Sequence, residues 1–255
     1  METIEITAVI FDLDGVIADT SEYHYLSWQR LADEEGLPFD RQVNERLRGK
    51  SRRASLDIIL GGHTVDDEQA AAWLERKNDY FMQIFRDHAT ECLLPGVVPL
   101  IQELRLAGIK VGVGSASRNA RWILQQLGIA ELLDAIIDGL DVEHSKPAPD
   151  VFLHVADQMG VAAAHCVVLE DAAAGIEAAL AAGMWVIGLG PGQRVGHAHA
   201  RFDSLEGVTP AAIIAALAGA SRRTPTPNPQ PPTPQPPTPQ PPTPHAGTLA
   251  GRWAS

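Results

Sequence analysis

The stretch AVIFDLDGVIADT, residues 8–20, decides the fold, because a short apolar run passes directly into acids. The apolar, β-branched run from Ile6 to Phe11 is typical of a strand buried on both faces in a parallel sheet. Asp12 follows it at the strand end, and Asp14 lies on the same side two residues later. Two carboxylates this close repel each other unless a cation lies between them, and oxygen ligands of this kind favour Mg²⁺. Taken alone, both acids are better explained as turn and cap residues, because Asp is common in turns and at helix N-caps.

Four more short apolar runs follow, at residues 109–114, 135–138, 166–169 and 185–189. Helical patterns separate most of them, at residues 97–107, 119–127, 149–159 and 173–182. Alternation of strand and helix predicts a doubly wound α/β domain with a Rossmann-like parallel sheet. In such a sheet the functional site lies at the carboxyl ends of the strands.

The first strand does not lead straight to the second. Between residue 20 and about residue 94 apolar and aromatic residues recur at helical spacing, which predicts a helical cap inserted after the first strand. We therefore expect a core domain of residues 1–19 and 93–220, a cap domain of residues 20–92, and a tail of residues 221–255. The tail holds a proline repeat at residues 224–244 that favours an extended spacer, with a ligand for a proline-recognition domain as the alternative.

Composition limits the function classes. The 255 residues are 45% hydrophobic, enough for a full core, and the net charge of −12 disfavours binding to nucleic acid or to an anionic membrane surface. Cys92 and Cys166 lie far apart without CxxC spacing, as expected of two reduced thiols. The chain shows neither a basic leader nor about 20 consecutive apolar residues, so we expect a soluble cytoplasmic protein.

Three later strand ends also carry polar groups. The stretch GSASRN, residues 114–119, offers serine hydroxyls and free backbone N–H groups to a phosphate, although a serine there is often only a helix cap. HSKPAPD, residues 144–150, places Lys146 before two prolines; a lone lysine is usually a solvated charge. LEDAAAGI, residues 169–176, adds Glu170 and Asp171, a second acidic strand end able to complete a metal site.

These four motifs, in this order, resemble those of the haloacid dehalogenase-like phosphotransferases over about residues 5–190. The resemblance implies an aspartyl-phosphate formed on Asp12 and a general acid/base role for Asp14. It implies that Lys146 and Ser115, with the Ala116 amide, hold phosphate oxygens. It also implies an Mg²⁺ site whose ligands are Asp12, the carbonyl of Asp14, Asp171 and, as a weaker candidate, Glu170.

Within this superfamily, the cap stretches ADTSEYHYLSWQRLADEEG, RLRGKSRRASLDIIL and ERKND are similar to those of β-phosphoglucomutases. That likeness implies that Arg52 grips the phosphate that is not being transferred, and that His24 helps to place Asp14. Without this likeness, we would interpret Arg52 as a solvent-exposed arginine and His24 as a histidine with only a structural role. Departures are few: Arg48 and Arg118 replace a frequent lysine, and Ala172 a frequent serine. Further implied substrate contacts are Trp28, Gly49, Lys50, Ser55, Lys77, Asn78, Ala116, Ser117, Arg118 and Asn119.

The expected activity is interconversion of β-D-glucose 1-phosphate and β-D-glucose 6-phosphate, with Mg²⁺ as cofactor and glucose 1,6-bisphosphate as activator and intermediate. The expected partners are small sugar phosphates, and the family likeness favours a monomer. One alternative is a sugar-phosphate phosphatase of the same fold, in which water takes the phosphate from Asp12. The remaining alternative, a noncatalytic phosphosugar-binding protein, has no need of both Asp12 and Asp14.

Overall fold

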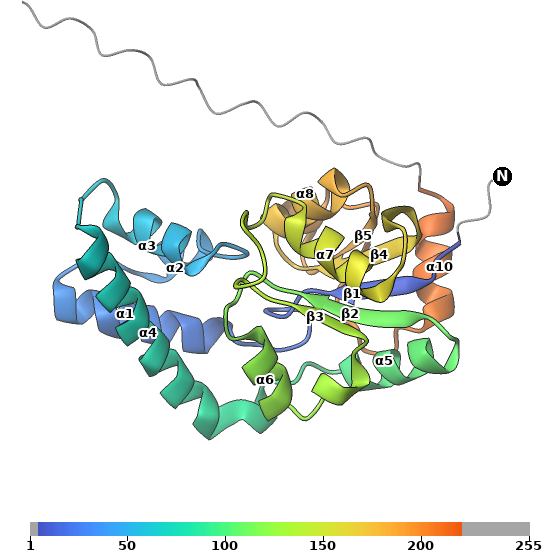
Figure 1. Ribbon diagram of the computed structural model, residues 1–255, viewed down its shortest axis with the longest axis horizontal. Helices are drawn as coiled ribbons and strands as arrows, with labels where there is room; N and C mark the ends of the chain where they lie inside the picture. The colour runs from blue at the N-terminus through green and yellow to red at the C-terminus, as the bar shows by residue number, and fades with distance from the viewer. Residues whose placement is uncertain (1–4, 221–255) are drawn as a thin grey trace, which may run out of the picture. The chain divides into compact units, whose positions relative to one another are not determined.

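A computed structural model describes residues 5–220, and a parallel sheet flanked by helices forms one part of them (Figure 1). Its strands are β1 (Ala8–Phe11), β2 (Lys110–Gly114), β3 (Ala135–Ile137), β4 (Cys166–Glu170), β5 (Trp185–Leu189) and β6 (Ala200–Phe202). The order across the sheet is β3-β2-β1-β4-β5-β6, and each of the pairings is parallel. The strand β1 therefore lies between β2 and β4, so the ends of three motif-bearing strands meet. The predicted doubly wound parallel sheet is confirmed.

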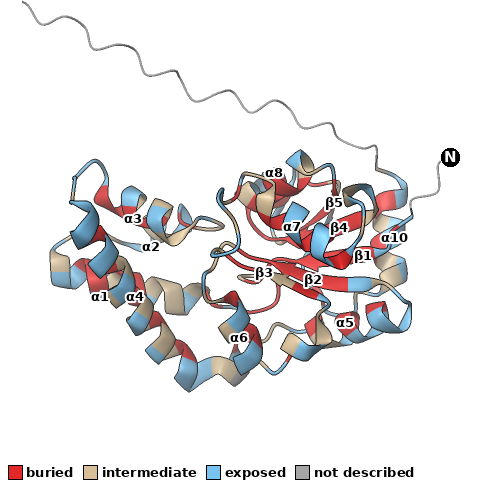
Figure 2. Cartoon of the chain, in the orientation of Figure 1, coloured by how far each residue is buried: buried red, intermediate tan, exposed pale blue. Residues whose placement is uncertain are grey.

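Helices cover both faces of the sheet. Alternate residues of β1 show this: Val9 and Phe11 belong to one buried cluster, while Ala8 and Ile10 belong to the other. The first cluster includes residues of α5 (Val97–Leu106), α6 (Ala120–Gln126) and α10 (Pro210–Ala218). The second includes residues of α7 (Asp150–Met159), α8 (Ala173–Ala181) and the short α9 (Gly192–Val195). Figure 2 shows the strands as the most continuously buried part of the chain.

The predicted strands and core helices agree with the structure to within two residues at each end. The strand β6 and the helix α10 were not predicted. β6 has three half-buried or exposed residues with Arg201 at its centre, so it lacks the apolar run of a buried strand. α10 did carry a signal: Thr209 accepts a hydrogen bond from the Ala212 N–H at 3.2 Å, and Pro210 occupies the first turn. Three 3₁₀ turns complete the described elements: η1 (Ala89–Glu91), η2 (Ala130–Leu132) and η3 (Ala163–His165).

The segment between β1 and β2 is helical, as expected. It holds α1 (Ser21–Glu35), α2 (Arg41–Glu45), α3 (Arg52–Leu60) and α4 (Asp67–His88), with a buried cluster of its own around Trp28, Leu56 and Trp73. The end of α4 contributes Phe81 and Phe85 to the first buried cluster of the sheet, the one that includes Val9 and Phe11. The described residues all belong to one compact unit, so the domain boundaries at 19/20 and 92/93 stay predictions. The predicted tail, residues 221–255, lies outside the described residues.

The two connections between the sheet and this helical segment run side by side. The Asp19 N–H donates to the Cys92 carbonyl at 2.8 Å, and the Leu94 N–H donates to the Ile17 carbonyl at 2.9 Å. An isolated bridge joins Ala18 to Leu93 between them. The pairing holds the start of α1 and the end of α4 close to the carboxyl end of β1, where Asp12 and Asp14 lie.

Two further observations bear on the environment expected from the sequence. Cys92 and Cys166 are both buried and free. Within residues 5–220, no helix combines the length and the apolar character required to cross a membrane.

Candidate active site

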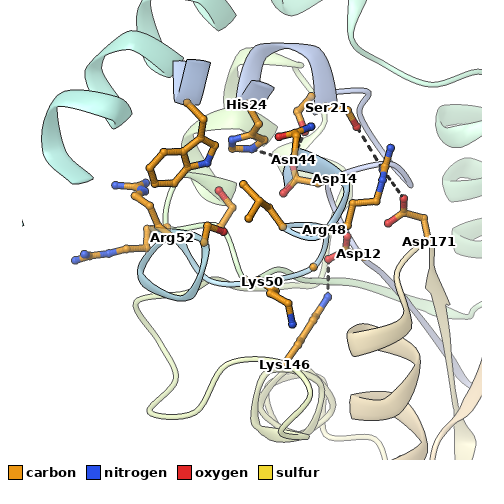
Figure 3. A pocket seen from close by; sticks show the side chains of 18 of the residues that line it. Asp12, Asp14, Ser21, His24, Asn44, Arg48, Lys50, Arg52, Lys146 and Asp171 are labelled. Carbon is orange, nitrogen blue, oxygen red and sulfur yellow. Dashed lines mark hydrogen bonds and ion pairs between the residues drawn. The ribbon is translucent and has the colours of Figure 1, made fainter. Parts of the chain in front are cut away.

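A cavity lies between the carboxyl edge of the sheet and the helices α1 to α4 (Figure 3). Most of the residues expected at the site line it. These are Asp12, Asp14, His24, Trp28, Gly49, Lys50, Arg52, Ser55, Lys77, Ala116, Ser117, Arg118, Lys146 and Asp171. Residues from all four motifs and from three cap helices thus meet in one place.

Lys146 is the cation at the sheet end of the cavity. Its Nζ donates to Asp12 Oδ1 at 2.6 Å and to Glu170 Oε2 at 2.8 Å, and the side chain is 1% exposed. Burial opposes the charged ammonium, but the charges of Asp12 and Glu170 outweigh it and raise the pKa of Lys146 above its ordinary value. Lys146 is therefore a permanent positive charge beside the Asp12 carboxylate.

The three acids Asp12, Glu170 and Asp171 fit a metal ion. They are buried, and one ligand oxygen from each lies within 4.8 Å of the others. Burial, and after it repulsion between the acids, raises the pKa of Glu170 to about 8 and that of Asp171 to about 7, as expected of acids crowded together away from solvent. Glu170 already uses both oxygens, accepting from Lys146 and from the Ala172 N–H at 3.0 Å. Asp12 and Asp171 are thus the better-placed direct ligands, and oxygen donors suit Mg²⁺.

Gly15 brings the first motif against Asp171. Its φ is +83°, a conformation that favours glycine, and a Cβ built there would lie 2.4 Å from Asp171 Oδ2. Only a residue without a side chain lets the turn after β1 pass this close. The geometry of the acid cluster therefore depends on this glycine.

Asp14 is held from two sides. The Thr20 hydroxyl donates to Asp14 Oδ1, and His24 Nε2 lies 3.7 Å from the same oxygen. Burial raises the pKa of Asp14, but His24 and Thr20 together outweigh burial and lower it below the ordinary value. In this arrangement Asp14 is ionised and ready to accept a proton. A proton-donating role requires that its pKa rise when a phosphate dianion lies alongside.

His24 is in turn oriented by Lys77. Lys77 Nζ lies 2.9 Å from His24 Nδ1, and the His24 ring stacks on Phe81 at a centroid distance of 4.2 Å. Because Nε2 faces the Asp14 carboxylate, we assign the ring hydrogen to Nε2, which leaves Nδ1 to accept from Lys77. Burial lowers the pKa of both His24 and Lys77, and repulsion from a neighbouring cation adds to this in each case. The helices α1 and α4 thus hold a chain of hydrogen-bonding groups that ends at Asp14.

The opposite end of the cavity is basic. Burial lowers the pKa of Arg52 to about 10, and repulsion from Arg118 adds to this effect. In residues 5–220 neither arginine forms an ion pair. Lys50 is exposed at the same cavity. The lining as a whole holds six lysines and arginines against three aspartates, although the chain carries a net charge of −12.

Four expected residues do not line the cavity. Ser115 is 1% exposed, and its hydroxyl accepts from the Ser117 N–H at 3.0 Å. Asn119 donates to Asn78 Oδ1 at 2.7 Å, so these two amides, from the core and from α4, engage each other. Glu170 lies beneath Lys146, as described above. Their expected contacts with phosphate, sugar or metal stay predictions.

Five lining residues were not predicted as contacts: Thr20, Ser21, Asn44, Leu47 and Arg48. Arg48 is the most consequential of them. Its Nη1 donates to Asp171 Oδ2 at 3.0 Å and lies 3.4 Å from Ser21 Oγ. The arginine-rich stretch RLRGKSRRAS, in which Arg48 precedes Gly49, was a signal that some arginine of this segment enters the site. Spacing alone does not tell which arginine of such a run points inward.

Comparison with known proteins agrees with this geometry. The chain is 44% identical over 190 residues to a β-phosphoglucomutase of Bacillus subtilis (strain 168), covering 73% of this chain and 84% of the relative. It is 37% identical over 177 residues to the fructose-1-phosphate phosphatase YqaB of Escherichia coli (strain K12), covering 69% and 92%. The crystal structure of β-phosphoglucomutase from Clostridium difficile superposes with a TM-score of 0.80 at 36% identity, covering 83% of this chain and 97% of that one.

The family profile of the haloacid dehalogenase-like hydrolases matches residues 6–183, which include all four motifs and the helices α1 to α4. The acids and the lysine that carry the motifs converge at the carboxyl edge of the sheet. The chain belongs to the haloacid dehalogenase-like hydrolase family.

Proposed function

We propose that this protein is a Mg²⁺-dependent phosphotransferase that interconverts β-D-glucose 1-phosphate and β-D-glucose 6-phosphate through β-glucose 1,6-bisphosphate. Its 44% identity to a β-phosphoglucomutase supports the reaction. We propose in addition that the protein is a cytoplasmic monomer and that its substrates are small sugar phosphates. The finer claim, mutase rather than phosphatase, needs support from the site itself.

The observation that carries the proposal is the pair Arg52 and Arg118. One comes from α3 and the other from the loop after β2, and they repel each other across the cavity without an ion-pair partner in the described chain. Two facing guanidinium groups are stable together when a dianion lies between them. A second phosphate, held here while the first reacts at Asp12, satisfies that requirement. A bisphosphate intermediate is the kind of ligand with charge at both ends.

The acidic end of the cavity suits the transfer step. An Asp12 carboxylate oxygen attacks phosphorus, an aspartyl-phosphate forms, and the bond from phosphorus to the sugar oxygen breaks. Lys146 neutralises charge on the phosphate oxygens as they approach Asp12. Bound Mg²⁺, held by Asp12 and Asp171 with Glu170 behind them, would supply the remaining charge neutralisation.

Asp14 handles the proton of the sugar hydroxyl. When the aspartyl-phosphate gives its phosphoryl group to a sugar, Asp14 takes the proton of the attacking hydroxyl. In the second half-reaction Asp14 returns a proton to the leaving sugar oxygen. Its lowered pKa in the ligand-free arrangement keeps Asp14 ionised, which is the form that the base step requires. The base step comes first if the enzyme starts as the phosphoenzyme. His24 and Lys77 keep Asp14 pointed into the cavity.

A sugar-phosphate phosphatase is the second candidate. The specific observation in its favour is the 37% identity to a fructose-1-phosphate phosphatase over most of that protein's length. The same Asp14 that accepts a sugar proton also accepts one from water. The difference between the two activities is whether water or a sugar hydroxyl reaches the aspartyl-phosphate.

One experiment separates these candidates. The full chain is incubated with Mg²⁺, β-glucose 1-phosphate and a trace of glucose 1,6-bisphosphate, while glucose 6-phosphate and free phosphate are followed together. Formation of glucose 6-phosphate without equivalent phosphate release supports the mutase. Phosphate release alone supports the phosphatase and overturns the proposal. Absence of turnover with any phosphosugar, with bisphosphate binding retained, leaves a binding protein.

A further inference from the structure

Arg194, on α9 just beyond β5, reaches the acid cluster from outside the four motifs. Its Nε donates to the main-chain carbonyl of Asp171 at 2.7 Å, and its Nη2 lies 3.7 Å from Asp171 Oδ2. Its Nη1 lies 3.6 Å from Oε1 of Glu45, at the end of α2. One guanidinium therefore contacts the backbone and the carboxylate of Asp171, and a helix of the inserted segment as well.

The backbone of Asp171 lies between two regular elements. It follows the last residue of β4, and the first helical hydrogen bond of α8 runs from the Ile176 N–H to the carbonyl of Ala172, one residue later. On the other side, the Asp171 carboxylate packs against the backbone of Gly15. The Asp171 carboxylate thus lies against the Gly15 turn and accepts from Arg48, while Arg194 holds the Asp171 carbonyl.

The course of the Arg194 side chain is set by close packing. A Cβ built on Gly190 would lie 2.7 Å from Arg194 Nη2, so the guanidinium crosses the bare backbone at the end of β5. The side chain is 28% exposed. A planar fork with donors on three nitrogens is required to contact the Asp171 carbonyl, the Asp171 carboxylate and Glu45 together, which a lysine does not provide.

With Arg48, these charged side chains form a closed ring of ion pairs that runs from Arg194 to Asp171, Arg48, Glu45 and back to Arg194. Arg48 Nε donates to Glu45 Oε1 at 2.9 Å, and Arg48 Nη1 donates to Asp171 Oδ2. Glu45 and Arg48 come from α2 and the residues after it, while Asp171 and Arg194 come from the sheet edge. The orientation of the Asp171 carboxylate is therefore tied to the position of α2 through both arginines.

We infer that Arg194 is a positioning residue for Asp171 as a metal ligand, an inference that rests on the Mg²⁺ site of the proposed function. Two physical effects oppose each other at this position. The contacts hold Asp171 in place, which strengthens metal binding, while the positive charge repels a dication, which weakens it. Outer contacts of this kind typically change metal affinity by about 10- to 100-fold, so positioning is the larger effect.

Calorimetric titration of the full chain with Mg²⁺ tests this inference, using R194K, R194Q and the control R201Q. R194K keeps the charge and loses the fork, while R194Q loses the charge as well. Positioning predicts that both weaken Mg²⁺ binding by about tenfold or more. Arg201 also donates to a backbone carbonyl, that of Gly190 at 2.9 Å, and to an acid, Asp203, but not to Asp171, so R201Q should match the unmodified protein.

Tighter binding by R194Q with no change in R194K would show that Arg194 acts through charge alone, and unchanged affinity in both would also overturn the inference. Thermal denaturation without metal is recorded for each variant, and R194K decides the question if R194Q does not fold. D171N separates this inference from the site it rests on. If the unmodified chain binds no Mg²⁺, or if D171N binds it equally well, the proposed metal site is wrong.

Discussion

Truncation of Arg52 should separate binding of the second phosphate from chemistry at Asp12. In R52A the guanidinium that faces Arg118 is lost, and the acid cluster around Asp12 stays intact. A fork to a phosphate makes two charge-assisted hydrogen bonds, each worth about 1.5–3 kcal/mol. Relief of the repulsion with Arg118 offsets part of this, so we take the lower end, about 3 kcal/mol. That is a loss of roughly 10²-fold in kcat/KM for the bisphosphate.

The assay compares two phosphoryl donors, β-glucose 1,6-bisphosphate and acetyl phosphate, under the same conditions. Acetyl phosphate carries no second phosphate, so its kcat/KM should change by less than about threefold in R52A, since Arg52 does not contact Asp12. The matched control is R53A. Arg53 is the next residue of α3, but its side chain is 50% exposed and paired with Asp57 at 3.1 Å, so its loss should affect neither donor.

Two results would refute this reasoning. Equal loss with both donors would mean that R52A damages the site as a whole. A loss below about fivefold for the bisphosphate alone would mean that the second phosphate is held elsewhere.

Further predictions concern the acid cluster. D12N should abolish turnover of every phosphoryl donor while leaving a cooperative thermal transition, and an active D12N would remove Asp12 from the nucleophile's role. G15A should lower Mg²⁺ affinity at least tenfold by displacing the Asp171 carboxylate, measured by calorimetry, whereas G36A, which meets no atom within 4 Å, should not. The folded metal-free chain holds protons on Glu170 and Asp171 above the pH at which unfolded carboxyls release them, so its stability should fall as pH rises from about 5 to 8. Mg²⁺ replaces those protons, and the rise in Tm that it causes should grow over the same range; a rise independent of pH would contradict this.

Much of the fold was predictable because its signals are local. An apolar run followed by acids marks β1 and Asp12, and strand and helix patterns alternate through residues 97–189 with errors of two residues or fewer. A buried parallel strand needs a continuous apolar stretch, so burial is written directly into the sequence. β6 escaped because an edge strand with Arg201 at its centre has no such stretch.

The residue types of the site were also predictable, since a strand that ends in acids or a lysine places them at one edge of the sheet. Sequence spacing did not reveal which of the arginines at positions 46, 48, 52 and 53 point inward. In the structure Arg52 faces Arg118, Arg48 donates to Asp171, and Arg53 is half exposed and pairs with Asp57 outside the cavity.

Those choices depend on contacts between segments far apart in the chain. Thr20 and His24 lower the pKa of Asp14, and Arg194 reaches Asp171 only because β5 lies beside β4. A pKa and an ion pair are set by distance and burial, which arise when the sheet and the helices pack together. The sequence alone therefore indicated phosphoryl transfer at Asp12, while only the tertiary structure decided which cations face one another across the cavity.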